Sequence, residues 1–275
     1  MLRYLLVLSR PRFWLYLAGP VLVGVSYAAE TVGELFAPAA VVLFAYFLLP
    51  ANVYLYGVND VFDRDVDEAN PKKEGREARY QGGTAVAAVV AVCGLLLVPV
   101  AVPLPDQAWP YLAGWFLLAT EYSAPPLRFK TTPLFDSVSN GLYILPGAAA
   151  YAAIAGAHPP LLAVAGGWLW AMGMHTFSAI PDIEPDREAG ITTTATVLGK
   201  ESAFAYCAST WLLSAGVFAF VDYRLGFLLL AYPVLVFGIR WLRVDVDRAY
   251  WWYPAVNTLV GTVFTLGGLW GVVHG

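Results

Sequence analysis

Apolar residues occur in long blocks along this chain, and short polar segments separate the blocks. Most blocks approach about 20 residues, the length that an α-helix needs to cross roughly 30 Å of hydrocarbon. We identify nine candidate membrane spans, which cover residues 13–29, 35–58, 84–101, 108–121, 137–156, 160–181, 203–221, 224–241 and 251–273. The pattern therefore predicts an all-α membrane protein with nine transmembrane helices.

The composition supports the same class. The chain has 275 residues, of which 59% are hydrophobic and 13% charged, and its mean hydropathy is +0.62. Soluble globular chains are nearer to half apolar and about a quarter charged, so this composition excludes that class. No polar segment is long enough for a separate soluble domain, and no cleavage site follows the first span. We expect residues 1–275 to form a single transmembrane domain that retains its first helix.

The distribution of charge predicts the orientation of the chain in the membrane. With nine spans and a cytoplasmic N-terminus, every one of the 16 lysines and arginines except Arg224 lies on the cytoplasmic side, as the positive-inside rule requires. Most of the 20 acidic residues follow them, and only Glu30, Glu34, Asp106 and Asp222 lie in the opposite loops. Acidic residues contribute little to topology. Their gathering therefore has another cause, and we expect an active site that faces the cytoplasm from a multi-pass protein of the cell membrane.

The first acidic cluster follows the second span. Asn59, Asp63 and Asp67 are spaced by four residues, so they share one face if the helix continues. Carboxylates that lie close together repel one another unless a cation intervenes, and Mg²⁺ prefers oxygen ligands. The alternative is a solvated loop in which these acids pair with nearby basic residues such as Arg64 and Lys72.

A second acidic cluster ends the sixth span. Asp182 and Asp186 are again four residues apart and again on the predicted cytoplasmic face, although Pro185 disfavours a regular helix. The two clusters lie at the ends of corresponding helices, four spans apart. This placement suggests two halves that face each other across a central cavity, each contributing a metal site.

A basic segment lies between the fourth and fifth spans, where residues 122–130 read YSAPPLRFK. An arginine such as Arg128 can bind phosphate through two hydrogen bonds, while Lys130 supplies a point charge. Both residues could instead be simple cytoplasmic anchors. Beside two acidic clusters, however, they favour a diphosphate bridged by Mg²⁺, and a membrane setting makes an isoprenyl diphosphate the natural ligand.

The cysteines and histidines indicate no further site. Cys93 and Cys207 lie in apolar stretches without the spacing of a zinc site. His158, His175 and His274 are scattered, and we expect none of them to be catalytic, although His175 lies just before the second acidic cluster.

Three segments together resemble the signatures of the UbiA-type intramembrane prenyltransferases. Residues 59–67 (NDVFDRDVD) resemble the first aspartate motif of that family and residues 182–190 (DIEPDREAG) the second. Residues 122–130 resemble the connecting loop of its chlorophyll synthase and homogentisate prenyltransferase branches. The resemblance extends over nearly the whole chain because the order of the motifs and the number of spans also agree.

The resemblance implies a set of functional residues. The residues that would bind Mg²⁺ and support catalysis are Asn59, Asp63 and Asp67 for one ion, and Asp182 and Asp186 for the other. The residues that would bind the diphosphate are Arg128 and Lys130, with Asn59, Arg12 and Tyr122 as further candidates.

Within the family, three stretches are most similar to the lycopene elongase/hydratases: residues 9–14, 121–126 and 175–182. This similarity implies transfer of a dimethylallyl group from dimethylallyl diphosphate to lycopene, with hydration, in the synthesis of C50 carotenoids. The implied partners are these two substrates and membrane lipid, with no nucleic acid.

Other functions stay open at this point. The acceptor could be a chlorin, a quinone precursor or a glycerol-phosphate lipid. A secondary transporter would place its acids near the middle of the bilayer, whereas these acids lie at one face. A catalytically silent assembly subunit would not need both aspartate motifs.

Overall fold

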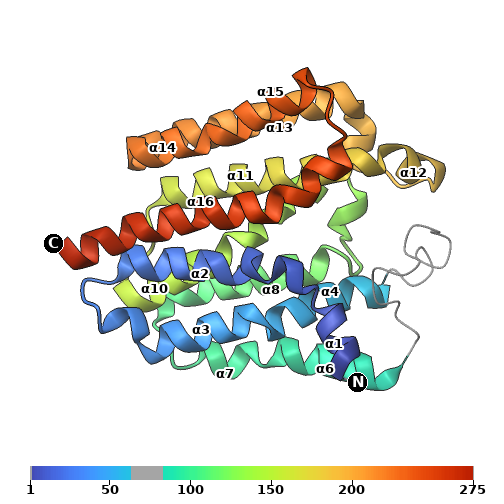
Figure 1. Ribbon diagram of the computed structural model, residues 1–275. Coiled ribbons are helices and arrows are strands. Elements are labelled where there is room, and N and C mark those ends of the chain that lie inside the picture. The colour runs from blue at the N-terminus through green and yellow to red at the C-terminus, as the bar shows by residue number, and fades with distance from the viewer. Residues whose placement is uncertain (1, 63–82, 275) are drawn as a thin grey trace.

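The computed structural model describes residues 2–62 and 83–274, and this part of the chain is helical with turns and loops between the helices (Figure 1). Asp63 and Asp67 lie outside the described residues. The α-helices are α1 (Leu2–Leu8), α2 (Trp14–Ala28), α3 (Pro38–Leu48), α4 (Pro50–Phe62), α6 (Thr84–Leu95), α7 (Leu97–Ala101), α8 (Trp109–Glu121), α9 (Phe135–Val138), α10 (Leu145–Ala155), α11 (Leu161–Ala179), α12 (Ile183–Glu188), α13 (Thr194–Val221), α14 (Tyr223–Leu229), α15 (Ala231–Trp241) and α16 (Val246–His274).

Six helical stretches among the described residues are long and apolar enough to cross a membrane. They are Pro38–Phe62, Thr84–Ala101, Phe135–Ala155, Thr194–Val221, Tyr223–Trp241 and Val246–His274. The prediction of an all-α membrane protein is thereby confirmed. The three other expected spans are also helical, as α2, α8 and α11, but do not meet the same criteria of length and apolarity. The count of nine spans and the cytoplasmic N-terminus stay predictions.

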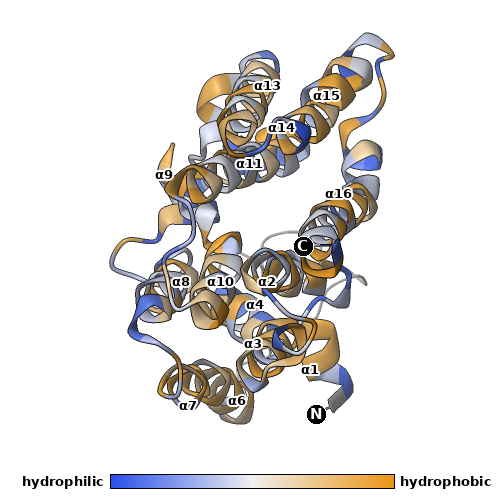
Figure 2. Ribbon diagram, turned by 90° about the vertical axis from the view of Figure 1, so that its left-hand side faces the viewer, coloured by the Kyte–Doolittle hydropathy of each residue, from blue (hydrophilic) through white to orange (hydrophobic). Residues whose placement is uncertain are grey.

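The outer surface suits a hydrocarbon environment. Large apolar side chains point outward, including Phe220, which is 84% exposed, and Trp241, which is 76% exposed. Apolar colour likewise covers the ribbons of most helices in the view along the bundle (Figure 2). Many exposed large apolar side chains of this kind are typical of contact with a membrane or a partner rather than with water.

The buried side chains form two separate clusters, one in each half of the chain. The first runs from Leu8 to Ala152 and includes Trp115 and Phe47, which meet edge to face at 5.1 Å. The second runs from Met174 to Phe264 around Trp211. This division agrees with the predicted arrangement of two halves, and the cavities described below lie between them.

The span predicted over residues 35–58 contains a break between α3 and α4. Pro50 has no backbone N–H, so the carbonyls of the preceding turn need other donors. The buried amide of Asn52 supplies them, because its Nδ2 donates to the carbonyls of Phe47 at 2.8 Å and Leu48 at 3.1 Å. The helix then continues to Phe62, which places Asn59 within α4.

Helices α2 and α10 approach so closely that only glycine fits at their crossing. A Cβ atom at Gly147 would lie 2.6 Å from the carbonyl oxygen of Pro20, and one at Gly24 would overlap the carbonyl of Gly147. Both glycines also line the larger of the two cavities. The crossing therefore fixes one wall of that cavity.

Candidate active site

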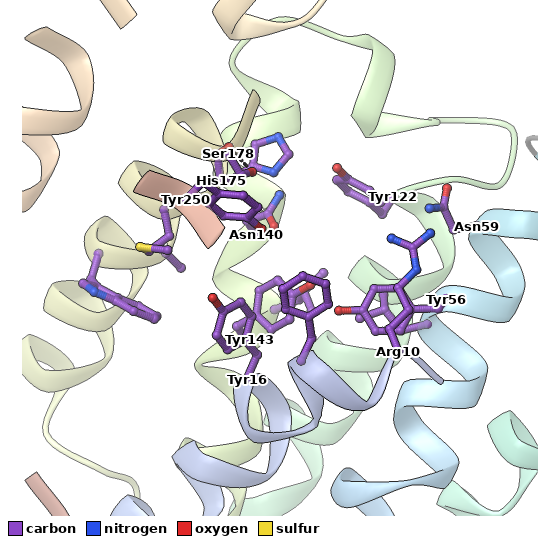
Figure 3. Close-up of a pocket in the computed structure, with 16 residues that line it drawn as sticks. Arg10, Tyr16, Tyr56, Asn59, Tyr122, Asn140, Tyr143, His175, Ser178 and Tyr250 are labelled. Atoms are coloured by element: carbon purple, nitrogen blue, oxygen red, sulfur yellow. Dashed lines mark hydrogen bonds between the residues drawn. The ribbon is translucent and has the colours of Figure 1, made fainter. Parts of the chain in front are cut away.

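A cavity of about 210 Å³ lies between the two halves (Figure 3). Polar and aromatic side chains line most of it. The lining residues are Arg10, Phe13, Tyr16, Leu55, Tyr56, Asn59, Tyr122, Asn140, Leu142, Tyr143, Trp170, Ala171, Met174, His175, Ser178 and Tyr250. Two of the residues proposed from the sequence, Asn59 and Tyr122, thus face the same space.

Asn59 connects α4 to the loop that follows α8. Its Oδ1 accepts hydrogen bonds from Ser123 Oγ at 3.1 Å and from Lys130 Nζ at 3.2 Å. Burial lowers the pKa of Lys130 to about 8, and the nearby Asp60 carboxylate opposes this shift. An anion that entered here would restore the stability of the charged amine.

The loop folds back over the end of α4. The backbone N–H of Lys130 donates to the carbonyl of Tyr122 at 3.0 Å, and Arg128 adopts a left-handed backbone conformation with φ of 43°. Arg128 Nη2 donates to the carbonyl of Phe62 at 3.2 Å. Its guanidinium therefore lies at the C-terminal end of α4, just before the segment that carries Asp63.

Arg10 lines the cavity, although the sequence pointed to Arg12. Arg10 Nη2 lies 3.6 Å from Asp60 Oδ1, and its guanidinium lies 4.8 Å from the centre of the Tyr56 ring. Arg12 is exposed, stacks 3.7 Å over the Trp251 ring and donates to the Trp251 carbonyl. A left-handed turn at Arg10, with φ of 49°, gives the two arginines these different directions.

Asp182 and Asp186 do not line this cavity. Asp182 ends a short 3-10 turn, and Asp186 lies in α12, so their four-residue spacing falls on nearly continuous helix despite Pro185. Arg187 secures α12 through Nη2, which donates to the carbonyl of Thr196 at 2.7 Å. Helix α12 lies at the same end of the bundle as the C-terminal end of α4 (Figure 1). Within the described ranges, no three histidine, cysteine or acidic side chains gather into a metal site.

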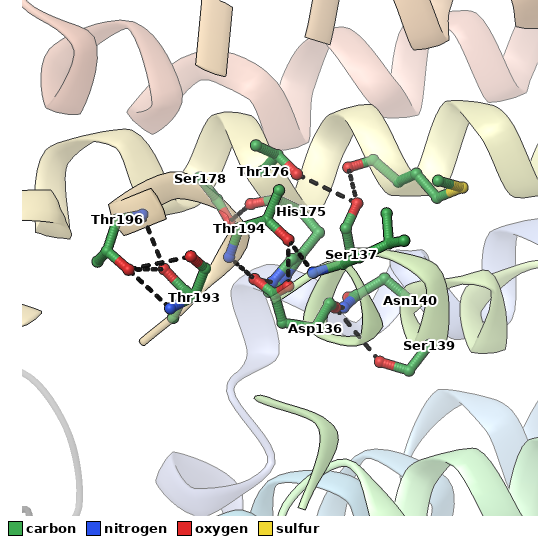
Figure 4. Close-up of polar contacts among 12 residues, drawn as sticks. Asp136, Ser137, Ser139, Asn140, His175, Thr176, Ser178, Thr193, Thr194 and Thr196 are labelled. Atoms are coloured by element: carbon green, nitrogen blue, oxygen red, sulfur yellow. Dashed lines mark hydrogen bonds and ion pairs between the residues drawn. The ribbon is translucent and has the colours of Figure 1, made fainter. Parts of the chain in front are cut away.

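The opposite wall carries an acid–histidine pair that sequence reasoning did not predict (Figure 4). Asp136 is fully buried, and its Oδ2 lies 3.5 Å from His175 Nε2. Thr194 donates to the same carboxylate through its backbone N–H at 3.0 Å and through its hydroxyl. In the sequence, Asp136 is only a single acid before an apolar block, which gives no signal for this pairing.

A second, larger cavity of about 520 Å³ adjoins the first. Tyr16 and Trp170 line both cavities. The side chains that line the larger cavity are mostly apolar, and none of those in the described part of the chain is charged. Its few polar groups include Asn257, whose Nδ2 donates to Tyr16 Oη at 3.0 Å and whose Oδ1 accepts from Tyr232 Oη at 2.8 Å.

Comparisons with known proteins agree with this geometry. The profile described as the UbiA prenyltransferase family matches residues 17–270. A lycopene elongase/hydratase of Halobacterium salinarum is 80% identical over 100% of both chains, and one of Haloferax volcanii is 68% identical over 99% of this chain and 90% of its own length. The structure of a UbiA homolog from Archaeoglobus fulgidus bound to DMAPP and Mg²⁺ superposes with a TM-score of 0.77 at 21% identity, covering 98% of this chain and 99% of that one. At that identity it establishes the shared fold.

Proposed function

The chain belongs to the UbiA prenyltransferase family, and we propose that it transfers a dimethylallyl group from its diphosphate to lycopene, with addition of water. One observation carries this proposal: a polar and aromatic cavity adjoins a large uncharged cavity, and Tyr16 and Trp170 line both. A charged donor and a long hydrocarbon acceptor could meet at that junction. The names of the relatives from Halobacterium and Haloferax support the choice of acceptor and the hydration.

We assign the metal ions to the oxygen ligands of the two acidic motifs. Asn59 would bind one Mg²⁺ together with Asp63 and Asp67, which lie outside the described residues, and Asp182 and Asp186 would bind the other. An amide oxygen and carboxylates are the hard ligands that Mg²⁺ prefers. When bound, Mg²⁺ would neutralise the charge that develops on the leaving diphosphate.

The protein's own cations would hold the diphosphate. Lys130 lies at Asn59, Arg128 at the end of α4, and Arg10 in the cavity wall. Positive groups fixed in advance around the leaving oxygens lower the barrier to breaking the allylic C–O bond. The faces of aromatic rings such as those of Tyr16 and Tyr143, which line the cavity, could stabilise the resulting carbocation.

The uncharged cavity favours a hydrocarbon acceptor over the alternatives. A glycerol-phosphate lipid would bring a phosphate to a cavity in which no described lining residue is charged. Burying an unpaired charge costs several kcal/mol or more. A terminal double bond of lycopene meets no such penalty, and its attack on the allylic carbon would leave a tertiary cation for water to capture.

The remaining assignments follow from the same arrangement. The ends of α4 and α12 would face the cytoplasm, where a soluble isoprenyl diphosphate could enter from water. Transport would require titratable groups near the middle of the bilayer, whereas α12 and the C-terminal end of α4, which carry Asp186 and Asn59, lie toward one end of the bundle (Figure 1). A transferase in the cell membrane therefore accounts for their position better than a transporter does.

The proposal is tested with membranes that contain the protein, supplied with Mg²⁺, dimethylallyl diphosphate and lycopene. We expect C45 and C50 carotenoids with added hydroxyl groups, identified by chromatography and mass spectrometry, and their loss with EDTA. Turnover only with another acceptor or a longer donor would retain the prenyltransferase and reject lycopene as its substrate.

A further inference from the structure

We propose that His175, held by the buried carboxylate of Asp136, is the base that accepts a proton from the water that hydrates the acceptor cation. The inference rests on the proposed function and extends it to the last chemical step. Sequence reasoning assigned no role to His175, because a lone histidine on an apolar helix has no partner that the sequence reveals.

The pair is built in a way that fixes the imidazole. The carboxylate of Asp136 accepts two hydrogen bonds from Thr194, one of them from the backbone N–H at 3.0 Å. The carboxylate therefore cannot turn away from His175, whose Nε2 lies 3.5 Å from Oδ2. A carboxylate at one ring nitrogen favours the tautomer that carries the proton there, and so leaves the other nitrogen as an acceptor.

The position of His175 suits a step that follows ionisation. It lines the smaller cavity, and 15% of its side chain is exposed. In the close-up, His175 and Asn59 lie on different sides of Tyr122 (Figure 3), and the Tyr122 ring meets the imidazole edge to face at 6.0 Å. The base is thus separated from the groups that we assign to the diphosphate.

No other described residue of this cavity could serve equally well. The lining contains arginine, tyrosine, asparagine, serine and tryptophan side chains, but no carboxylate among the described residues, and His175 is its one histidine. Imidazole is the side chain that most readily exchanges a proton near neutral pH. The aromatic and apolar surroundings would otherwise leave a cation with no proton acceptor except the departed diphosphate.

The proposed step is balanced as follows. The allylic C–O bond breaks and its electron pair leaves with the diphosphate. The terminal π bond of the acceptor forms the new C–C bond and leaves a tertiary cation. The oxygen of a water molecule then bonds to that carbon, and one of its protons passes to the free nitrogen of His175. The proton then returns from the imidazole to water.

The pair also joins α9 to α11, and Thr194 connects the same carboxylate to the start of α13, so a purely structural role must be distinguished from a chemical one. A base decides how the cation is resolved, whereas a structural contact affects all steps alike. Without the base, the cation would lose a proton from carbon instead, which gives an elongated alkene of the same carbon number without the hydroxyl group. The ratio of hydroxylated to alkene product therefore reports on the base.

The experiment compares wild type, His175→Gln and His175→Ala, with the exposed His158→Gln as the matched control. Each is assayed in membranes with dimethylallyl diphosphate, Mg²⁺ and lycopene in H₂¹⁸O. We expect the ratio of ¹⁸O-hydroxylated to alkene product to fall at least tenfold in both His175 variants while C–C bond formation continues. Added imidazole should raise this ratio in His175→Ala only, because only that variant leaves space for it.

Three results would overturn the inference. An unchanged product ratio in His175→Gln would show that the diphosphate or bulk water takes the proton. A parallel loss of all products, without rescue by imidazole, would show a structural role. If wild type itself gives no elongated carotenoid, the proposed function fails and this inference fails with it. If wild type gives the expected products and the His175 variants give the same product ratio, only the inference is rejected.

Discussion

Substitution of Lys130 by methionine tests the proposed diphosphate site most directly. Methionine has a similar length but no charge. In the free protein the change removes one hydrogen bond, from Lys130 Nζ to Asn59 Oδ1 at 3.2 Å, while Ser123 Oγ continues to donate to the same oxygen at 3.1 Å. The loss of a hydrogen bond whose partner keeps another donor costs about 1 kcal/mol or less. The variant should therefore fold.

Lys130→Met should weaken diphosphate binding by more free energy than it costs in folding stability. A hydrogen bond from a charged donor contributes about 1.5–3 kcal/mol, and the site is half-buried, so salt screens it less than a surface pair. Because each 1.4 kcal/mol changes an equilibrium constant about tenfold, Lys130→Met should raise the Kd for dimethylallyl diphosphate with Mg²⁺ by roughly 10- to 100-fold. The value of kcat/KM should fall at least as much if the charge also stabilises the leaving group.

Calorimetric titration of purified protein with the diphosphate would measure this change. Lys130→Arg keeps the charge and should lose less affinity for the diphosphate than Lys130→Met, although the planar guanidinium cannot reproduce the geometry of the amine. The matched control is Lys200→Met, which removes an exposed lysine from α13 and should leave Kd unchanged. If Lys130→Met bound the diphosphate as tightly as wild type, Lys130 would not contact it and the assignment would be wrong.

Three further predictions test other parts of the structure. Arg10→Met should lower kcat/KM about tenfold or more, whereas Arg12→Met, which loses its stacking on the exposed Trp251 and its hydrogen bond to the Trp251 carbonyl, should lower it less than threefold in steady-state assays. The reverse order would contradict the orientation of the two arginines. Gly147→Val should destabilise the protein by about 1–3 kcal/mol or more, because its Cβ would lie 2.6 Å from a carbonyl oxygen of α2, and a fluorescence melt in detergent would reveal a lower Tm. EDTA should abolish turnover, and added Mg²⁺ should restore it. Asp186→Asn should need a higher Mg²⁺ concentration than wild type for half-maximal activity. If its Mg²⁺ dependence were the same as that of wild type, Asp186 would not be one of the proposed ligands.

Much of the fold could be predicted from the apolar blocks, because hydrocarbon requires such blocks wherever a helix crosses it. The blocks do not mark where helices begin. The span predicted over residues 203–221 belongs to α13, which begins at Thr194 with a turn that Thr193 caps by exchanging hydrogen bonds with Thr196. A kink at Gly199, where φ is 71°, separates this turn from the long part of the helix. These first turns lie near the polar boundary and carry charged residues such as Lys200. The hydropathy pattern therefore misses them.

The site was only partly predictable, for a different physical reason. Motif spacing suggested Asn59 as a metal ligand because acidic residues follow it at four-residue intervals in the sequence. Lys130 was suggested as a diphosphate ligand because positive charge attracts phosphate. By contrast, the contact of Asp136 with His175 depends on how α9 packs against α11, and the position of Arg10 depends on one left-handed turn. Such contacts arise from tertiary packing, which local pattern does not record.

The same distinction explains why the sequence indicates the reaction more clearly than the acceptor. The diphosphate requires particular charged residues, whereas a hydrocarbon acceptor requires only a cavity of suitable shape. That shape depends on the junction of the two cavities, where Asn257 of α16 bonds both Tyr16 of α2 and Tyr232 of α15. These bonds connect the two halves at the point where donor and acceptor would meet. Under the proposed function, the spacing of the halves at Tyr16 would therefore determine which acceptor can reach the allylic carbon, while the residues around Asn59 would determine how that carbon becomes reactive.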